Sequence, residues 1–342
     1  TYNYFESIQT KIAPAIRSIK NQYLQKNTVS FATQDMQKLN WNVDKNQANI
    51  YLQQDISVLL YDLTQEYGRY DLSCDGGCIF VFDQNRVEES EWYIEIWSNI
   101  HLNIWDKEYT TDRLVVYSKN DLITINNYDR DSYAGIPRNS FHWWLIFKKD
   151  YMKDINWNQQ NKFLVINKLP FSQYMKGIVE TNDTESDTKN KVMALISKSY
   201  ALFYMNPNNV HPNIPLQATY NAVDDSRIFQ KYVWAWLEQT ITKRYRALEQ
   251  TKDEIITYNN QIVVLPYFSC SAGFTYSAKE KRWWTDTPYL KTRFDLGICK
   301  DKDFSGHWVW LSGLWAERRS KFGRSYQDIL KYYYQGIQIE NL

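Results

Sequence analysis

Apolar and polar positions alternate over short runs between residues 68 and 168, and this pattern predicts β-strands. The runs are rich in β-branched and aromatic residues and fall at 79–82, 91–96, 113–117, 122–126, 144–147 and 163–166. Turn-forming clusters such as Asp75-Gly76-Gly77 and Asn126-Asn127 separate several of them. We therefore expect a β-rich region that ends at the breaker Pro170.

Helical spacing follows this region. Residues 187–205 place apolar side chains on one broad face, which predicts a helix. Two further helices are expected, one late in 229–250 and one over 326–334. Between them, the β-rich runs 254–258 and 261–265 flank an Asn-Asn pair, and this spacing predicts a hairpin with a two-residue turn.

The N-terminal region, residues 1–67, lacks the short alternating runs that follow it. Residues 8–24 and 50–67 carry apolar residues at mixed helical spacing without strong caps, which is typical of packing helices. The fold class is therefore α+β. We expect a helical or loosely ordered region over 1–67 and a β-rich domain over 68–342.

Composition narrows the class of protein. The 342 residues carry 40 basic and 39 acidic side chains, and this balance argues against a nucleic-acid partner. The chain is long enough to bury a sizeable core without disulfides. No apolar run reaches the roughly 18 residues of a membrane span. Because the chain begins at Thr1 rather than Met, a leader or anchor removed earlier would leave no trace in it.

The four cysteines allow two interpretations. In an oxidising compartment the natural pairs are Cys74–Cys78 and Cys270–Cys299. The alternative is a zinc site built from all four, or from two of them with His. The first interpretation is favoured because the chain has no second short-spaced cysteine pair. We expect no metal and no other cofactor.

Three ordered segments carry a family resemblance. The first segment comprises LVINKLP at 164–170, YMKGIVE at 174–180 and SKSYAL at 197–202. The second comprises ITYN at 256–259, PYFSCS at 266–271 and TPYL at 287–290. The third comprises GH at 306–307, LSG at 311–313 and SYQDILKYYY at 325–334. Together they resemble the stage II sporulation protein D family (SpoIID/LytB-like). The resemblance covers about residues 85–340 and is strongest after 160, which implies a SpoIID-like domain with its catalytic motifs in 164–342.

The resemblance implies a reaction and a catalytic residue. Members of this family are lytic transglycosylases that cut the glycan strands of peptidoglycan, or relatives that enhance a cell-wall amidase. The family's catalytic Glu falls on Glu180 in this chain. Cleaving a glycosidic bond requires an acid that protonates the leaving oxygen, and a carboxyl with a raised pKa can serve. Without the resemblance, Glu180 would read as a solvated residue before the next helix, near Asp183, Glu185 and Asp187.

The resemblance also implies residues that line the glycan groove. His307 follows Gly306 in the family's Gly-His-Gly-type motif, and Lys198 stands where the family usually has Arg. Lys and Arg are not interchangeable where two parallel hydrogen bonds are needed. Each of the candidates could equally be a packing or surface residue. The substrate-binding candidates are His307, Tyr174, Lys198, Tyr200, Gln230, Tyr232, Ser269, Ser271 and Ser312.

Tryptophan is frequent and glycine scarce in this chain, with 14 Trp against 11 Gly. The family motif Gly-His-Gly-Val-Gly-Leu-Ser-Gly reads Gly306-His-Trp-Val-Trp-Leu-Ser-Gly313 here. Trp stands where a small residue is expected at seven positions, 143, 234, 236, 284, 308, 310 and 315. Either the groove carries aromatic platforms for sugars, or these residues are glycines whose UGA codons were read as Trp.

We favour the glycine hypothesis, because glycines in such loops allow positive φ and close approach of a ligand. The coding DNA distinguishes the two explanations. UGA codons at the seven positions are expected, whereas UGG codons would leave only the remodelled groove.

The resulting prediction is a lytic transglycosylase that cleaves the MurNAc–GlcNAc bond with a 1,6-anhydro product. Its partners would be peptidoglycan glycan strands and, in one reading, a cell-wall amidase. The protein would be localised outside the cytoplasm, either secreted or in the cell envelope. Two alternatives stay open: a non-catalytic glycan-binding enhancer of an amidase, and a structural envelope protein whose aromatic residues serve packing.

Overall fold

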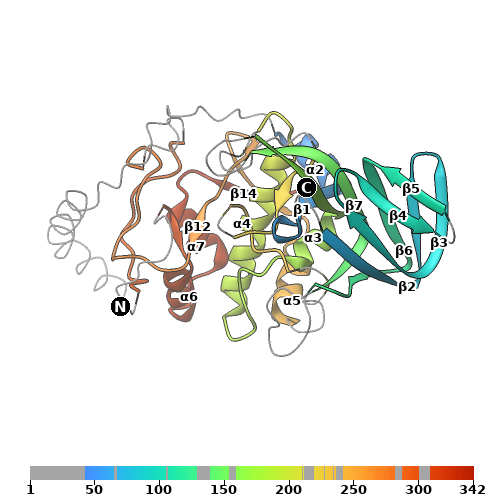
Figure 1. The fold of residues 1–342 in the computed structure, drawn as a ribbon. Coiled ribbons are helices and arrows are strands. Elements are labelled where there is room, and N and C mark those ends of the chain that lie inside the picture. The colour runs from blue at the N-terminus through green and yellow to red at the C-terminus, as the bar shows by residue number, and fades with distance from the viewer. Residues whose placement is uncertain are drawn as a thin grey trace, which may run out of the picture.

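The fold is described from a computed structural model. It describes residues 43–342 apart from 65–67, 105–106, 129–138, 154–158, 210, 212–218, 227, 234, 236–241, 282–286 and 300–308. The expected helix at 8–24 lies outside the described residues. Figure 1 shows the strands β2–β6 at one end, helices α6 and α7 toward the other, and helix α4 between them. The architecture is a β-rich α+β fold, as the sequence predicts.

A nine-stranded sheet forms the β-rich end, with strand order β5-β4-β3-β2-β6-β7-β8-β1-β9. Its strands are β1 (Asp55–Leu59), β2 (Gly68–Phe82), β3 (Asn85–Ile96), β4 (Ile100–Ile104), β5 (Lys107–Thr111), β6 (Arg113–Ile125), β7 (Ser140–Lys153), β8 (Gln159–Pro170) and β9 (Ala222–Val223). Five of the six predicted runs lie inside these strands, and the sixth, 122–126, extends one residue past the end of β6. The pairs are antiparallel except β1 with β9, which is parallel.

The helix expected over 50–67 is wrong for most of its length. Helix α2 (Lys45–Leu52) covers only the first three residues of this range, and β1 follows with Ile56 and Val58 buried on the sheet. Apolar residues two apart on a strand share one face, and β1 pairs with β8 and β9. A short 3₁₀-helix, Tyr61–Leu63, then leads toward β2.

The helical part surrounds α4 (Asp187–Met205), whose predicted bounds are confirmed. The other elements are α3 (Phe171–Gly177), α5 (Thr242–Gln250), β10 (Glu254–Tyr258), β11 (Gln261–Ile262), β12 (Tyr267–Phe268), β13 (Leu311–Ser312), α6 (Gly313–Lys321), α7 (Tyr326–Tyr333) and β14 (Gln338–Asn341). The predicted hairpin is β10 and β11, with β11 shorter than the predicted run 261–265, and the predicted C-terminal helix is α7. None of the helices in the described part of the chain is long and apolar enough to cross a bilayer.

The cysteines form the two expected disulfides, Cys74–Cys78 and Cys270–Cys299. The first closes a bulge in β2, where pairing with both neighbouring strands shifts register. Gly76 and Gly77 occupy this bulge with φ of 72° and 106°, a region that side chains rarely enter. The second disulfide joins β12's end to the segment before residue 300. Within the described ranges, no group of three His, Cys, Asp or Glu side chains is placed to hold a metal ion.

A second register shift, between β6 and β7, involves a tryptophan. It falls between the pairs Tyr117–Trp144 and Leu122–His142, so Trp143 on β7 lies opposite the unpaired residues 118–121 of β6. Trp143 has φ of 67°, and its N–H donates to the Asp121 carboxylate at 3.1 Å. A bulky residue in this left-handed conformation is strained.

Trp310 has the same property at the other end of the molecule. Its φ is 75°, it is fully buried, and it directly precedes β13. Trp315, by contrast, lies inside helix α6, where backbone conformation gives no reason for glycine. The backbone therefore supports the glycine hypothesis at positions 143 and 310. Residues 234, 236, 284 and 308 lie outside the described residues.

We predict that Trp143→Gly stabilises the protein by about 1 kcal/mol, because it relieves the left-handed strain at a position whose side chain is 44% exposed. Trp144→Gly is the matched control. Trp144 has no positive φ and its ring contacts Tyr117 and Lys168, so its loss should destabilise. Urea unfolding midpoints measure both changes. An equal loss of stability in the two variants would contradict strain at position 143.

Candidate active site

Glu180 lies three residues after helix α3, in an extended segment held by residues 231–233. Ile178 forms an antiparallel bridge with Tyr232. The Val179 N–H donates to the Lys231 carbonyl at 2.8 Å. The Lys231 N–H in turn donates to Oε1 of Glu180 at 3.0 Å. Backbone pairing thus fixes the place of the carboxyl group.

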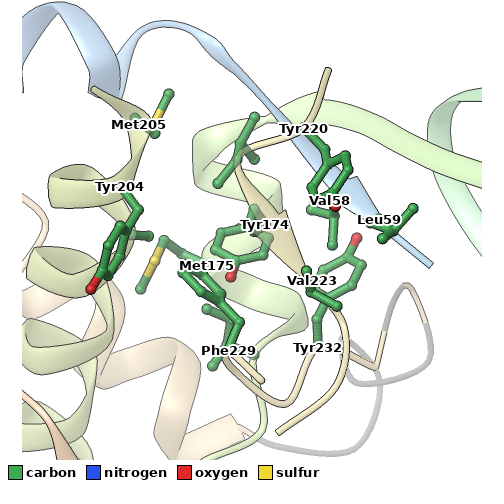
Figure 2. Close-up of a cluster of buried hydrophobic side chains, with 14 of the residues drawn as sticks. Val58, Leu59, Tyr174, Met175, Tyr204, Met205, Tyr220, Val223, Phe229 and Tyr232 are labelled. Carbon is green, nitrogen blue, oxygen red and sulfur yellow. The ribbon is translucent and has the colours of Figure 1, made fainter. Parts of the chain in front are cut away.

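Gly177 makes this pairing possible. A Cβ atom there would lie 2.3 Å from the Tyr232 ring, far inside van der Waals contact. The ring has little room to yield, because it stacks on Tyr174 at 5.2 Å and its hydroxyl donates to Asn167 at 2.9 Å. Figure 2 shows Tyr174 and Tyr232 side by side in the buried cluster. Any side chain at position 177 would push the Glu180 segment away.

A chain of hydrogen bonds leads from the core to Glu180. The Tyr174 hydroxyl donates to Oε1 of Gln230 at 3.0 Å. The Gln230 amide donates to the Tyr267 hydroxyl, and Tyr267 donates to the Glu180 carboxylate. Gln230 is fully buried, so its orientation is set by these partners. The structure thereby brings two of the expected residues, Tyr174 and Gln230, together with Glu180.

The environment of Glu180 makes it a weaker acid in the folded protein. Desolvation raises the pKa of its carboxyl above the ordinary value of 4.5. Hydrogen bonds from the Lys231 N–H and Tyr267, and the charge of Arg244, oppose this rise without cancelling it. The residue is partly solvent-exposed while its carboxyl group is closely surrounded by protein. Such a group can hold a proton and still meet a ligand.

Two of the neighbouring acidic residues, Asp183 and Glu185, hold the surrounding helices, while Asp187 is exposed. Asp183 accepts from the Thr242 and Lys243 N–H groups at 2.9 Å each, which caps the start of α5. Glu185 forms an ion pair with Lys189 in the first turn of α4. Asp187 opens α4 itself. Glu180 is the acidic residue of this stretch that faces Tyr267.

Lys198 makes internal contacts. Its amine is buried and donates to the carbonyls of Thr251, Lys252 and Glu254 at 2.6, 2.8 and 3.0 Å. These bonds use all three ammonium protons and hold the turn between α5 and β10. Burial lowers the pKa of Lys198 to about 8. Its expected role in binding substrate stays a prediction, since these contacts already occupy the amine.

Two of the expected serines meet at a different carboxylate. The Ser271 hydroxyl donates to Asp295 at 2.7 Å, and Ser312 also hydrogen-bonds to it. Tyr333 and the Gly297 N–H complete the shell at 2.7 Å each. Asp295 is fully buried, and desolvation raises the pKa of its carboxyl. This cluster ties the segment after β12 to β13 and α7.

The remaining candidates are distributed around these two clusters. The Tyr200 hydroxyl lies 2.7 Å from Nε2 of His211, within an aromatic group that includes Phe229. Ser269 is exposed beside Cys270. His307 lies outside the described residues, so its contact with glycan stays a prediction.

Two residues beside Glu180 were not anticipated as part of the site. Tyr267 lies in the recognised PYFSCS segment, yet nothing in its spacing indicates that its hydroxyl reaches Glu180. Arg244 occurs in the strongly polar stretch TKRYRALEQ, which reads as a solvated helix. The hydrogen bond from Tyr267 and the electrostatic interaction with Arg244 each join residues more than 60 positions apart in the chain, and a local pattern cannot reveal them.

Comparison with known proteins agrees with the sequence resemblance. Residues 159–258 match the family model described as SpoIID, stage II sporulation protein. This range contains α3, Glu180, α4 and α5. The chain therefore carries a SpoIID-family region, and the predicted family is confirmed.

The chain is also similar in sequence to the stage II sporulation protein D of Bacillus subtilis (strain 168). It is 30% identical over 139 residues, which cover 37% of this chain and 39% of the relative. The chain thus spans well under half the length of the curated relative that it matches.

We predict that Glu180→Gln is more stable than the wild type at pH 7 and equally stable at pH 4. A carboxyl whose pKa is raised on folding binds its proton more tightly in the folded state. The folded state therefore loses relative stability as pH rises from 4.5 through the raised pKa, and glutamine avoids this loss. Calorimetric melting temperatures at the two pH values measure it. Glu249→Gln, whose side chain is 72% exposed, should show no such pH-dependent gain.

Proposed function

We propose that the protein is a peptidoglycan lytic transglycosylase in which Glu180 is both acid and base. The observation that carries this proposal is the enclosed yet reachable carboxyl of Glu180, with its raised pKa and its two hydrogen-bond donors. A raised pKa keeps a proton available for the leaving oxygen at a pH where ordinary carboxyls have lost theirs. The family match around this residue supports the same reaction class.

The reaction proceeds in two proton transfers. Protonated Glu180 donates its proton to the oxygen of the MurNAc–GlcNAc bond, and the bond between that oxygen and C1 of MurNAc breaks. The carboxylate that remains is stabilised by the Lys231 N–H and the Tyr267 hydroxyl. It then accepts the proton of the C6 hydroxyl of MurNAc as that oxygen attacks C1. A 1,6-anhydro ring closes, and Glu180 is protonated again.

A single carboxyl is sufficient for this reaction, whereas glycoside hydrolases ordinarily use two. The acidic residues that follow Glu180 are not placed to act as a second catalytic carboxyl, because Asp183 is bound to α5 and Glu185 to Lys189. Asp224, whose charge acts on Tyr174, accepts a hydrogen bond from the Tyr61 N–H at 2.8 Å.

The proposed setting is the cell envelope or the outside of the cell. Peptidoglycan lies there, and the two disulfides fit an oxidising compartment. The proposed partners are the glycan strands themselves and a cell-wall amidase.

We predict that Glu180→Gln abolishes cleavage, lowering the rate by about 100-fold or more, because glutamine cannot donate the required proton. Zymograms on purified sacculi and mass spectrometry of released anhydro-muropeptides measure the loss. Glu249→Gln on the exposed face of α5 is the control and should keep full activity.

The outcomes separate the candidate functions. If wild-type protein releases no anhydro product but binds sacculi and stimulates an added amidase, the enhancer function holds instead. If Glu180→Gln retains cleavage, Glu180 is not the acid.

A further inference from the structure

Arg244 is a buried cation that the stability of the fold does not explain. It lies on α5 and is 1% exposed. Its Nη2 donates to the Met175 carbonyl at 3.1 Å, whereas Nε and Nη1 find no acceptor in the described part of the chain. Leaving buried donors unmatched costs roughly 1–3 kcal/mol, and more for charged groups. Unmet polar groups in a native structure call for a functional explanation.

The start of α5 is docked on the segment that carries Glu180. Asp183 accepts hydrogen bonds from Thr242 and Lys243, the first two residues of the helix. Met175, which binds Arg244, lies on α3, directly before the same segment. The start of α5 is thus tied to Asp183, after Glu180 in the chain, and Arg244 itself is tied to Met175, before it. Among the groups that act on the guanidinium, the Glu180 carboxylate is the strongest attraction, followed by Tyr267.

Several titratable or charged groups interact electrostatically with Glu180, each from a different element. They are Tyr174 on α3, Tyr200 on α4, Lys231 in the connecting segment, Arg244 on α5 and Tyr267 on β12. Of these, Lys231 and Arg244 carry a positive charge. The Lys231 side chain is exposed, so solvent and salt screen its charge. Arg244 is buried, so solvent screens its charge less, and it acts on Glu180 more strongly than Lys231 does.

We propose that Arg244 is a positioning residue for the reaction, holding the negative charge that Glu180 carries between its two proton transfers. This inference rests on the proposed function for its place in the cycle. Physically, a buried positive charge favours the carboxylate over the protonated acid. It therefore limits how far desolvation can weaken Glu180 as an acid, and it stabilises the state that must accept the second proton.

The test measures the titration of Glu180 directly. Carbon-13 resonances of labelled glutamate carboxyls are followed with pH in the full chain, and Glu180→Gln identifies the Glu180 signal. In Arg244→Gln we expect the Glu180 midpoint to rise by about 1 pH unit. Arg244→Lys keeps the charge and should shift the midpoint less. Arg246→Gln is the matched control on the same helix, since Arg246 is 60% exposed, and should leave the midpoint unchanged.

Activity should follow the same sign. The acid step requires protonated Glu180, so the rate falls as pH rises through its pKa. With Arg244 removed this alkaline limb should move upward by the same pH interval, with a lower maximal rate. An unchanged midpoint in a folded Arg244→Gln variant would overturn the proposal, as would an equal shift in Arg246→Gln.

A measurement on the wild type covers the case in which Arg244→Gln does not fold. The nitrogen-15 resonance of Arg244 Nε should change with the midpoint of Glu180 and should stay constant in Glu180→Gln. A constant resonance in the wild type would overturn the proposal. These titrations need no substrate, so a protein that couples Arg244 to Glu180 but cleaves nothing would refute the proposed function alone.

Discussion

Burial of helix α4 is the constraint on which the rest of the structure depends. The helix is covered on nearly every face, so its polar side chains must find partners inside the protein. Lys198 binds three carbonyls between α5 and β10, and Ser199 donates to the Val263 carbonyl at 2.7 Å beyond β11. Asn190 accepts from Thr181 at 2.6 Å, one residue after Glu180. The contacts that satisfy α4 therefore also locate α5, the hairpin and the Glu180 segment.

The site around Glu180 combines a firmly held backbone with two charged groups, Glu180 and Arg244, whose burial opposes folding. Backbone pairing and the close approach at Gly177 hold Glu180 rigidly, as catalytic geometry requires. Desolvation of its carboxyl and the unmatched donors of Arg244 both oppose folding. Asp295, by contrast, is surrounded by hydrogen-bond donors from Ser271, Ser312 and Tyr333. Buried charges that stay incompletely satisfied are typical of sites whose chemistry uses them.

The sequence predicts what depends on local pattern. The bounds of α4 follow from its apolar spacing and the cap at Ser186, and the hairpin follows from its Asn-Asn turn. Strand β1 was missed because five residues with two-residue alternation are easily read as part of a helix. Glu180 could be singled out only through family resemblance. Tyr267 acts on it through a hydrogen bond and Arg244 through its charge, both from distant segments of the chain, which no periodicity encodes.

The tryptophans connect the backbone to the chemistry. Strand β13 pairs in parallel with β12, and Leu311 lies opposite Tyr267, which donates to Glu180. Trp310, the residue before this pair, takes a conformation that glycine adopts without strain. The residue at position 310 therefore affects β13 directly and, through the pairing of β13 with β12, affects Tyr267, the donor to Glu180. A large indole at position 310 forces its neighbours to pack around it. With glycine there, the position of Tyr267 would depend on the backbone pairing of β12 with β13 alone.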